Sequence, residues 1–533
     1  MASPHVKSRR RRPASSGPGD LTPQQLHAKH AFSAALALAG GYAGASRSRP
    51  ALRHFDPVAT DADDDIGADL PTLRARSRDL ARNVPLAGGA LNTMVTNVVG
   101  TGLTMQSRID ADALGLDADA ADAWQRATER EWRGWAESRW CDATLGQDFY
   151  GLQSLAFRSA LESGDVLAIT PAIPRPGSSY RLTVQMIEAD LLCNPDYKAD
   201  TDRRVAGIDL DNVGAPVRYH FANRHPNTLR RGSGVTWTAV EARGARSGRP
   251  NVIHLFDRRR PGQTRGVPVL APVIEPLKQL GRYTEAELQA AVLAGAFAVF
   301  VKMDPAAFAD LFGDDETLKT NYLAPATRWD GRNTSSVDGP GRAVNLVPGE
   351  SVDTVNPGRP NDSFDPFVQA ILRQIGAALE LPFELLIKHY TSSYSAARAA
   401  LLDAYRFFRG RRAWLASHYC QPIYELWLAE AVALGRVQAP GFFADPAARR
   451  AYSGAEWVGD GPGSIDPLKE VDAAERRLAI GTSTLAAESV LHDGIDWETK
   501  HRQQVREQAA RAAAGLTAAP AAPRPPEPAD PNA

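Results

Sequence analysis

The sequence predicts a mixed α+β protein in which helices predominate. Long stretches with apolar residues at helical spacing occupy both sides of the central region, and short turn-bounded segments rich in β-branched residues lie between them. With 533 residues, of which 43% are hydrophobic, the chain can form several packed parts. Its net charge of −1 favours neither nucleic acid nor anionic lipid for the chain as a whole.

The first half of the chain predicts helices followed by short strands. Residues 74–99 and 118–135 have helical periodicity, and Trp124, Trp132 and Trp135 share one helical face, which predicts a core stripe. A turn at residues 211–214 predicts a hairpin. The expected strands are residues 166–170, 181–185, 205–210, 215–221 and 252–256.

Residues 261–301 contain the longest predicted helix. Pro268, Pro272 and Pro276 are compatible only with its start, because the first turn needs no intrahelical N–H partners. We therefore expect a helix from Val273 to Phe300, about 28 residues or roughly 42 Å long. Its last third, residues 290–301, is apolar on every face, so that part must be covered from several sides.

The second half predicts further helices separated by loops. Residues 304–361, rich in Gly, Pro, Asp and Asn, predict a small insertion. Asp365 is a candidate N-cap of the next helix, which Pro382 ends, and the polar stretch KHYTSSY (residues 388–394) is expected to be a loop. A helix over residues 396–434 should kink at Pro422, and capped helices should continue from Pro467 to residue 516.

No catalytic site, metal site or cofactor is predicted. The chain has no Gly-Lys dipeptide, which excludes a Walker-type ATPase, and no His-Glu-x-x-His. Ser392 and Ser393 lie beside His389 but lack a Gly-x-Ser-x-Gly elbow. The acidic run from Asp61 to Asp65 lacks the glycine of a calcium loop and predicts a solvated turn.

The cysteines and the termini indicate no other chemistry. Cys141, Cys193 and Cys420 have no metal-ligand or disulfide spacing and are expected to be buried free thiols. No signal peptide or membrane-spanning stretch is predicted, which favours the cytoplasm.

Eight fragments of the sequence, taken in order, resemble one known family, the portal proteins of tailed bacteriophages of the lambda type. The resemblance extends over roughly residues 74–516. The fragments are RNVPLAGGALNTMVTNVVGTGL (82–103), GDVLA (164–168), QMIEADLL (185–192), GIDLDNVGAPVRYH (207–220), RPGQTRGVPVLAPVI (260–274), LPFELL (381–386), YSAARAALL (394–402) and IDPLKE (465–470).

This resemblance implies a ring, typically a homododecamer, at one capsid vertex, through which double-stranded DNA is packaged and ejected. It implies assembly in the bacterial host cytoplasm and contacts with the terminase large subunit, the major capsid and scaffold proteins and the head–tail connector proteins. The expected parts are a loosely ordered arm (1–70), an α/β wing (71–260), a first stem helix (261–302), a clip (303–363), a second stem helix (364–382), a channel loop (383–395), a long helix returning to the wing (396–457), a helical crown (458–516) and a disordered tail (517–533).

Two sets of candidate site residues follow from this expected architecture. The candidates for contact with DNA in the channel are Lys388, His389, Tyr390, Ser392, Ser393 and Tyr394. The candidates for packing between subunits, where small side chains allow close approach, are Ala291, Ala294, Gly295 and Ala298. Two alternatives stay open at this point: a DNA-processing hydrolase with an unrecognised site, and another phage structural or tail protein.

Overall fold

The computed structural model describes residues 42–229, 234–295, 299–303, 313, 317, 350–354, 364–389, 394–461 and 467–516. The chain divides into two units, residues 1–61 and residues 62–533. The described part of the first unit has a short 3-10 turn, η1 (Ala43–Ala45), and an exposed pair between Arg47 and Asp56 at 3.4 Å. All elements below belong to the second unit.

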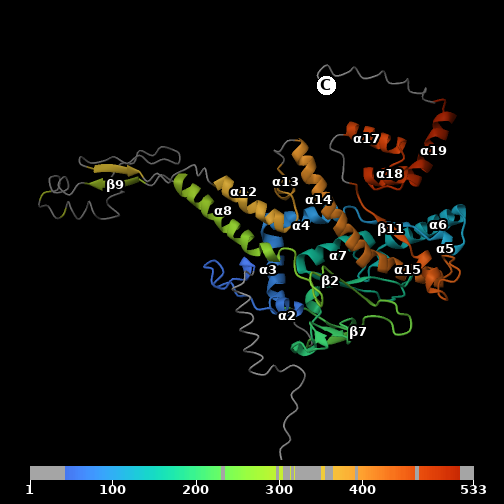
Figure 1. Cartoon of the computed structure of the whole chain (residues 1–533), viewed down its shortest axis with the longest axis horizontal. Coiled ribbons are helices and arrows are strands. Elements are labelled where there is room, and N and C mark those ends of the chain that lie inside the picture. Colours follow the sequence, from blue (N-terminus) through green and yellow to red (C-terminus); the bar gives the residue numbers. More distant parts are fainter. Residues whose placement is uncertain are drawn as a thin grey trace, which may run out of the picture. The chain divides into compact units, whose positions relative to one another are not determined.

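Helices form most of the second unit (Figure 1). In chain order they are α2 (Ala62–Gly67), α3 (Leu70–Asn83), α4 (Pro85–Val98), α5 (Ala111–Leu114), α6 (Ala118–Ala136), α7 (Phe149–Ser163), α8 (Ile274–Gly295), α12 (Phe364–Ala378), α13 (Phe383–Ile387), α14 (Tyr394–Leu415), α15 (Gln421–Ala433), α16 (Pro446–Tyr452), α17 (Pro467–Ala479), α18 (Leu485–Asp493) and α19 (Trp497–Ala513), with short 3-10 or π turns η2 (Arg139–Cys141), η3 (Ala189–Leu191), η4 (Pro195–Tyr197), η5 (Ala271–Val273) and η6 (Ala416–Cys420).

The strands form small antiparallel sheets between the helices. A three-stranded sheet has the order β3-β2-β8, a four-stranded sheet has the order β4-β5-β6-β7, and two further pairs are β1-β11 and β9-β10. Their bounds are β1 (Thr104–Ser107), β2 (Asp165–Ile169), β3 (Gln185–Ile187), β4 (Arg204–Val205), β5 (Ile208–Leu210), β6 (Pro216–Ala222), β7 (Trp237–Glu241), β8 (Val252–Phe256), β9 (Val299–Met303), β10 (Glu350–Thr354) and β11 (Ala455–Val458).

Most of the predicted elements of the first half are present. The strand predicted over residues 252–256 is observed with the same bounds as β8. The turn at residues 211–214 joins β5 to β6 in a hairpin, also as predicted. The helix predicted over residues 74–99 is divided at Val84, because Pro85 begins a new helix, α4. The prediction of a strand over residues 181–185 is wrong. Leu182 and Val184 form only isolated bridges, and β3 begins at Gln185.

The predicted tryptophan stripe on α6 is confirmed at the centre of the core. The Trp132 ring lies 5.0 to 5.9 Å, centroid to centroid, from five other aromatic rings, those of Trp135, Phe149, Tyr424, Trp427 and Trp457. Trp124 is only half-buried, and its Nε1 donates to the Gln438 carbonyl at 2.7 Å. The cluster joins α6 and α7 to α15, so residues far apart in the sequence share one core.

The long predicted helix is shorter than the sequence suggested. α8 begins at Ile274 as expected but ends at Gly295, and Val299–Met303 forms strand β9, paired with β10. The prediction of a helix to Phe300 is therefore wrong. Valine and phenylalanine pack well on a pleated surface, so an apolar run without a breaker becomes a strand where a partner strand is present.

The helix predicted over residues 396–434 has its kink close to the expected place. α14 and α15 are separated by the π-helical turn η6, which ends immediately before Gln421 and Pro422. Proline cannot donate a backbone hydrogen bond and clashes with the carbonyl four residues earlier, and a wider π turn relieves that clash. Gly435, with φ of 70°, follows the end of α15 as predicted.

The predicted cap at Asp365 is not present, since α12 already begins at Phe364 and Asp365 lies in its first turn. Residues 62–67, predicted as part of a loosely ordered arm with a solvated acidic turn, form helix α2. Cys141 and Cys420 are buried thiols as predicted, whereas Cys193 is half-buried. Most of the predicted insertion over residues 304–361 lies outside the described residues.

Two glycines hold the segment before α8 against the end of α7. Gly164, with φ of 90°, is the residue after α7, and its backbone faces that of Gly266. A methyl group added at Gly266 would overlap the Gly164 carbonyl and also contact the Phe256 side chain at 2.8 Å. Because the close neighbour is backbone, it cannot move aside without shifting α7 or β2.

We expect Gly266→Ala to destabilise the protein by several kcal/mol, in the range found for overpacked cores and strained backbone. The matched control is Gly281→Ala in α8, where an added methyl group meets nothing within 4 Å and the helix should gain up to about 1 kcal/mol. Urea unfolding followed by circular dichroism measures both variants. Equal stability of the two variants would contradict the assigned backbone contact.

Candidate assembly site

Helices α8 and α12 pack side by side as a pair (Figure 1). Tyr283 of α8 stacks on Phe364 at 5.4 Å and meets Phe367 edge-on at 5.2 Å, centroid to centroid. At the base of the pair, Leu277 and Leu280 of α8, Ile375 of α12 and Leu379, which follows α12, are buried in the main core. The base is therefore fixed to the rest of the unit.

The outer half of the pair has exposed apolar side chains. Leu288 and Val292 are each 65% exposed on consecutive turns of one face of α8, and Phe367 is 52% exposed. Of the predicted packing residues, Ala291 is exposed on the same helix. Ala294 and Gly295 belong to its last turn, where side-chain surroundings are not described, and Ala298 lies outside the described residues.

A buried ionic cluster lies near the base of the helix pair. Asp165, at the start of β2, is fully buried, and its carboxylate accepts from Arg74 Nη2 at 2.6 Å and from Arg265 Nε at 2.5 Å. His254 Nε2 of β8 lies 3.2 Å from the same carboxylate. The side chains of Arg74, Arg265 and His254 are each no more than 5% exposed. We call these four residues the Asp165 cluster.

Arg265 also connects several loops through its remaining donors. It donates to the carbonyl oxygens of Leu192 at 2.8 Å, Ala206 at 3.0 Å and Ala189 at 2.7 Å. Arg74 Nε donates to the carbonyl of Ser163 at 2.9 Å. A guanidinium has fixed, planar donors, so each of these bonds sets the position of a loop relative to Asp165.

The charges in the cluster shift one another's pKa values. Burial alone would raise the pKa of Asp165, but Arg265, Arg74 and His254 outweigh it and hold this pKa well below its ordinary value. Burial lowers the pKa of Arg74 to about 10 and also lowers that of His254, in spite of the nearby carboxylate. At neutral pH the cluster thus contains a carboxylate, two guanidinium groups and a neutral imidazole.

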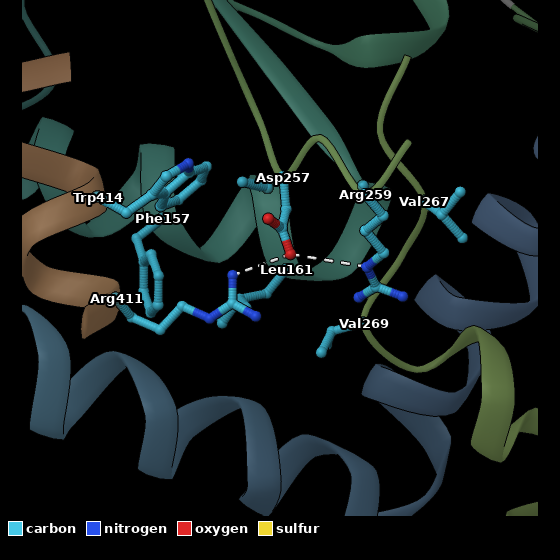
Figure 2. Close-up of a pocket in the computed structure, with 10 residues that line it drawn as sticks. Phe157, Leu161, Asp257, Arg259, Val267, Val269, Arg411 and Trp414 are labelled. Carbon is cyan, nitrogen blue, oxygen red and sulfur yellow. Dashed lines mark hydrogen bonds and ion pairs between the residues drawn. The ribbon is translucent and has the colours of Figure 1, made fainter. Parts of the chain in front are cut away.

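A second ionic contact joins α14 to the segment before α8. Figure 2 shows Asp257 between Arg411 and Arg259, with its carboxylate 3.0 Å from Arg411 Nη1 and 3.6 Å from Arg259 Nε. Phe157 and Trp414 line the same shallow pocket. All three charged side chains are partly exposed, so this contact adds little stability by itself and mainly orients α14.

The predicted channel residues are only partly described. Lys388 follows α13 in the left-handed conformation, with φ of 55°, and its side chain is exposed, as is that of His389. The His389 backbone N–H donates to the Glu384 carbonyl at 3.2 Å. Tyr390, Ser392 and Ser393 lie outside the described residues, and Tyr394 begins α14 without a described side-chain environment.

The acidic run in α2 has a role that the sequence did not suggest. Asp63 accepts from the Thr264 backbone N–H at 2.8 Å, and Asp65 pairs with Arg260. These carboxylates hold the loop at residues 260–264. In the part of the chain that the structure describes, no three His, Cys, Asp or Glu side chains are grouped to hold a metal ion, and no helix has the length and hydropathy to cross a membrane.

Sequence reasoning missed the Asp165 cluster. A signal was present, because GDVLA and RPGQTRG place Asp165 and Arg265 each beside a glycine in segments that resemble one family. A charged residue at the start of an apolar strand, needing a buried partner, could have suggested the pair. Arg74 and His254 had no such signal, since their proximity to Asp165 arises only from the fold.

With this geometry established, comparison with known proteins defines the class of the molecule. A family model described as phage portal protein, lambda family, matches residues 48–412, which is more than half of the chain. The chain belongs to this family of phage portal proteins.

The chain is also similar to individual proteins. The chain is 28% identical over 493 residues to the portal protein of Escherichia phage N15, covering 90% of this chain and 91% of that protein. It is 27% identical over 493 residues to portal protein B of Escherichia phage lambda, with the same two coverages. A chain from the virion of a native gene transfer agent particle has a TM-score of 0.40 and 15% identity, covering 79% of this chain and 93% of that one.

We expect Asp165→Asn to cost about 3–5 kcal/mol at neutral pH, because it leaves two buried arginines without their carboxylate. Since the folded pKa of Asp165 is depressed, the stabilisation is present above about pH 5 and is lost as the pH falls toward the folded value. The difference between wild type and variant should therefore shrink below pH 5.

The control is Glu456→Gln, which removes an exposed pair with Arg108 at 3.4 Å and should cost less than about 1 kcal/mol. Urea midpoints at several pH values measure both variants. A loss for Asp165→Asn no larger than that for Glu456→Gln would show that the cluster is not the main constraint we assign to it.

Proposed function

We propose that copies of this chain form a ring, a dodecamer, that sits at one vertex of a phage capsid and serves as the conduit for double-stranded DNA during packaging and ejection. The observation that carries this proposal is the exposed apolar outer half of α8, with Leu288 and Val292 each 65% exposed. A helix of this kind in a structural protein requires a covering surface.

A neighbouring copy is the simplest cover. In a ring, each subunit has one neighbour on either side and contacts the two neighbours through two different surfaces. Opposite faces of one helix can therefore both be covered. Burying a leucine or valine side chain completely contributes about 1.5–3 kcal/mol, and the gain recurs at every interface. Ala290, Ala291 and Ala294 have small side chains that allow close helix approach.

We assign the parts of the subunit to the expected portal plan and change one boundary. We assign α8 and α12 to the stem, the α/β region before them to the wing, and α17 to α19 to the crown. The pairing of β9 with β10 brings the two ends of residues 304–349 together, which supports a clip that leaves the stem and returns to it. The clip then begins near Val299, and the stem helix ends at Gly295.

The partners in this proposal are those of a portal. The clip would meet the terminase large subunit during packaging and the head–tail connector proteins afterwards, and the wing would meet the major capsid and scaffold proteins. The ring would assemble in the bacterial host cytoplasm and remain in the virion. The protein would act structurally, without a catalytic step. Membership of the lambda portal family supports this assignment over a hydrolase or a tail protein.

We expect Val292→Asp to prevent ring formation while leaving the monomer folded, because a charge at an exposed position costs little in the monomer but much in a dry interface. The same result is expected for Ala291→Glu. Light scattering gives the mass in solution, and negative-stain electron microscopy shows rings directly.

Gln289→Asp is the matched control, because it adds the same charge on the same helix at an exposed position that is already polar. It should weaken assembly less than Val292→Asp. Normal rings formed by Val292→Asp would remove α8 from the subunit interface, and a wild-type chain that stays monomeric at high concentration would refute the ring itself.

A further inference from the structure

One segment of the chain carries a strong local charge that the whole-chain balance hides. Residues 385–424 contain Lys388, Arg398, Arg406, Arg409, Arg411 and Arg412 against one carboxylate, Asp403, for a net charge of +5. The complete chain has a net charge of −1. The excess of basic charge lies on α14, the helix that follows the predicted channel loop, because Lys388 in that loop is balanced by Glu384.

The arginines of α14 divide into two groups by their contacts. Arg411 pairs with Asp257, and Arg412 donates to the carbonyl oxygens of Val98, Asn97 and Asp460 at 3.0 to 3.1 Å. These two arginines therefore bind other segments of the same chain. Arg406 and Arg409 are exposed, and no ion pair or hydrogen bond of their side chains is found among the described residues.

Helical geometry places Arg406 and Arg409 on the same face as Arg398, which is half-buried and has a contact of its own. At 100° per residue, Arg398, Leu402, Arg406 and Arg409 fall within about 80° of arc. The opposite face, with Ala404, Phe408 and Leu415, is buried against the core. Leu402 in the exposed face is 57% exposed. We call Arg398, Arg406 and Arg409 the arginine face of α14.

We infer that the arginine face of α14 contacts the phosphate backbone of DNA, together with Lys388 at the end of α13; this inference rests on the proposed function. The guanidinium group binds phosphate with two parallel hydrogen bonds. Arg398 and Arg409 are about 16 Å apart along the helix axis. One strand of B-DNA carries about five phosphates over that length, at 3.4 Å each.

The observations favour a nucleic acid over a second protein chain. The arginine face continues directly from the predicted channel loop, because α14 begins at Tyr394 and Lys388 precedes the loop. The acidic stretch with Asp110, Asp112, Asp117 and Asp119 already uses Asp110 and Asp117 as helix caps. Exposed contacts also suit a sliding duplex, since they break and re-form at little cost.

The test compares Arg406→Gln/Arg409→Gln with wild type as assembled rings. Fluorescence anisotropy with a labelled 30-base-pair duplex measures affinity over a range of salt concentrations. We expect roughly tenfold or greater loss of affinity at 0.1 M salt, and a salt slope smaller by about 2 for each engaged subunit. Arg406→Lys/Arg409→Lys, which keeps the charge, should retain the wild-type slope.

The matched control is Arg76→Gln/Arg130→Gln, which removes the same charge from exposed positions on α3 and α6. Its affinity and slope should stay close to wild type. Equal effects of the two double variants, or no DNA binding by wild-type rings, would overturn the inference. If Arg406→Gln/Arg409→Gln folds but forms no rings, the arginine face is a subunit contact, and the inference is also overturned.

A failure of the proposed function can be distinguished from a failure of this inference. It would appear as the absence of rings in electron micrographs of the wild-type chain, before any DNA is added. The wild-type and variant monomers would then be titrated with the same duplex. A difference between them would still support a phosphate contact at α14, and identical curves would overturn it.

Discussion

The carboxylate of Asp165 is the constraint on which the α/β region and the base of the α8–α12 pair depend. It is fully buried and ionised, and this state is tolerable only because Arg74 and Arg265 lie within hydrogen-bonding distance. Those two arginines come from α3 and from the segment before α8, and Arg265 also binds three loop carbonyls. The cluster thus specifies how distant segments meet, which an apolar contact of similar size would do less selectively.

The same region determines the direction in which α8 leaves the core. Gly164 and Gly266 make a close backbone contact, and the residues beside them, Asp165 and Arg265, form an ion pair. A few residues earlier in the chain, Asp257 connects this segment to Arg411 of α14 (Figure 2). A shift of α14 would therefore act on the base of α8 through short, polar contacts, while the outer half of α8 stays free to meet another surface.

The sequence predicted the elements whose signal is local and missed those that depend on tertiary contacts. The tryptophan stripe of α6, the strand β8 and the break near Pro422 follow from periodicity and proline chemistry. The end of α8 was misplaced because the apolar run 290–301 suits helix and strand equally, and only pairing with β10 decides. Arg74 lies 91 residues from Asp165, so no local pattern reveals their contact. The family resemblance, by contrast, was accessible from eight short fragments in order.

The net charge of the chain says little about its surface, because acidic and basic residues occupy different places and make different contacts. Several acidic residues cap helices or hold loops. Asp117 is the N-cap of α6, and Asp63 of α2 accepts a hydrogen bond from the Thr264 backbone. Some arginines are buried with a carboxylate, as in the Asp165 cluster, and others are exposed with no carboxylate partner among the described residues, as are Arg406 and Arg409 of α14. A buried arginine has lost its hydration and needs a fixed partner, whereas an exposed one keeps its hydration and can exchange partners. The first kind can fix the positions of neighbouring segments, and the second can bind an anion and release it, so one near-neutral chain contains both.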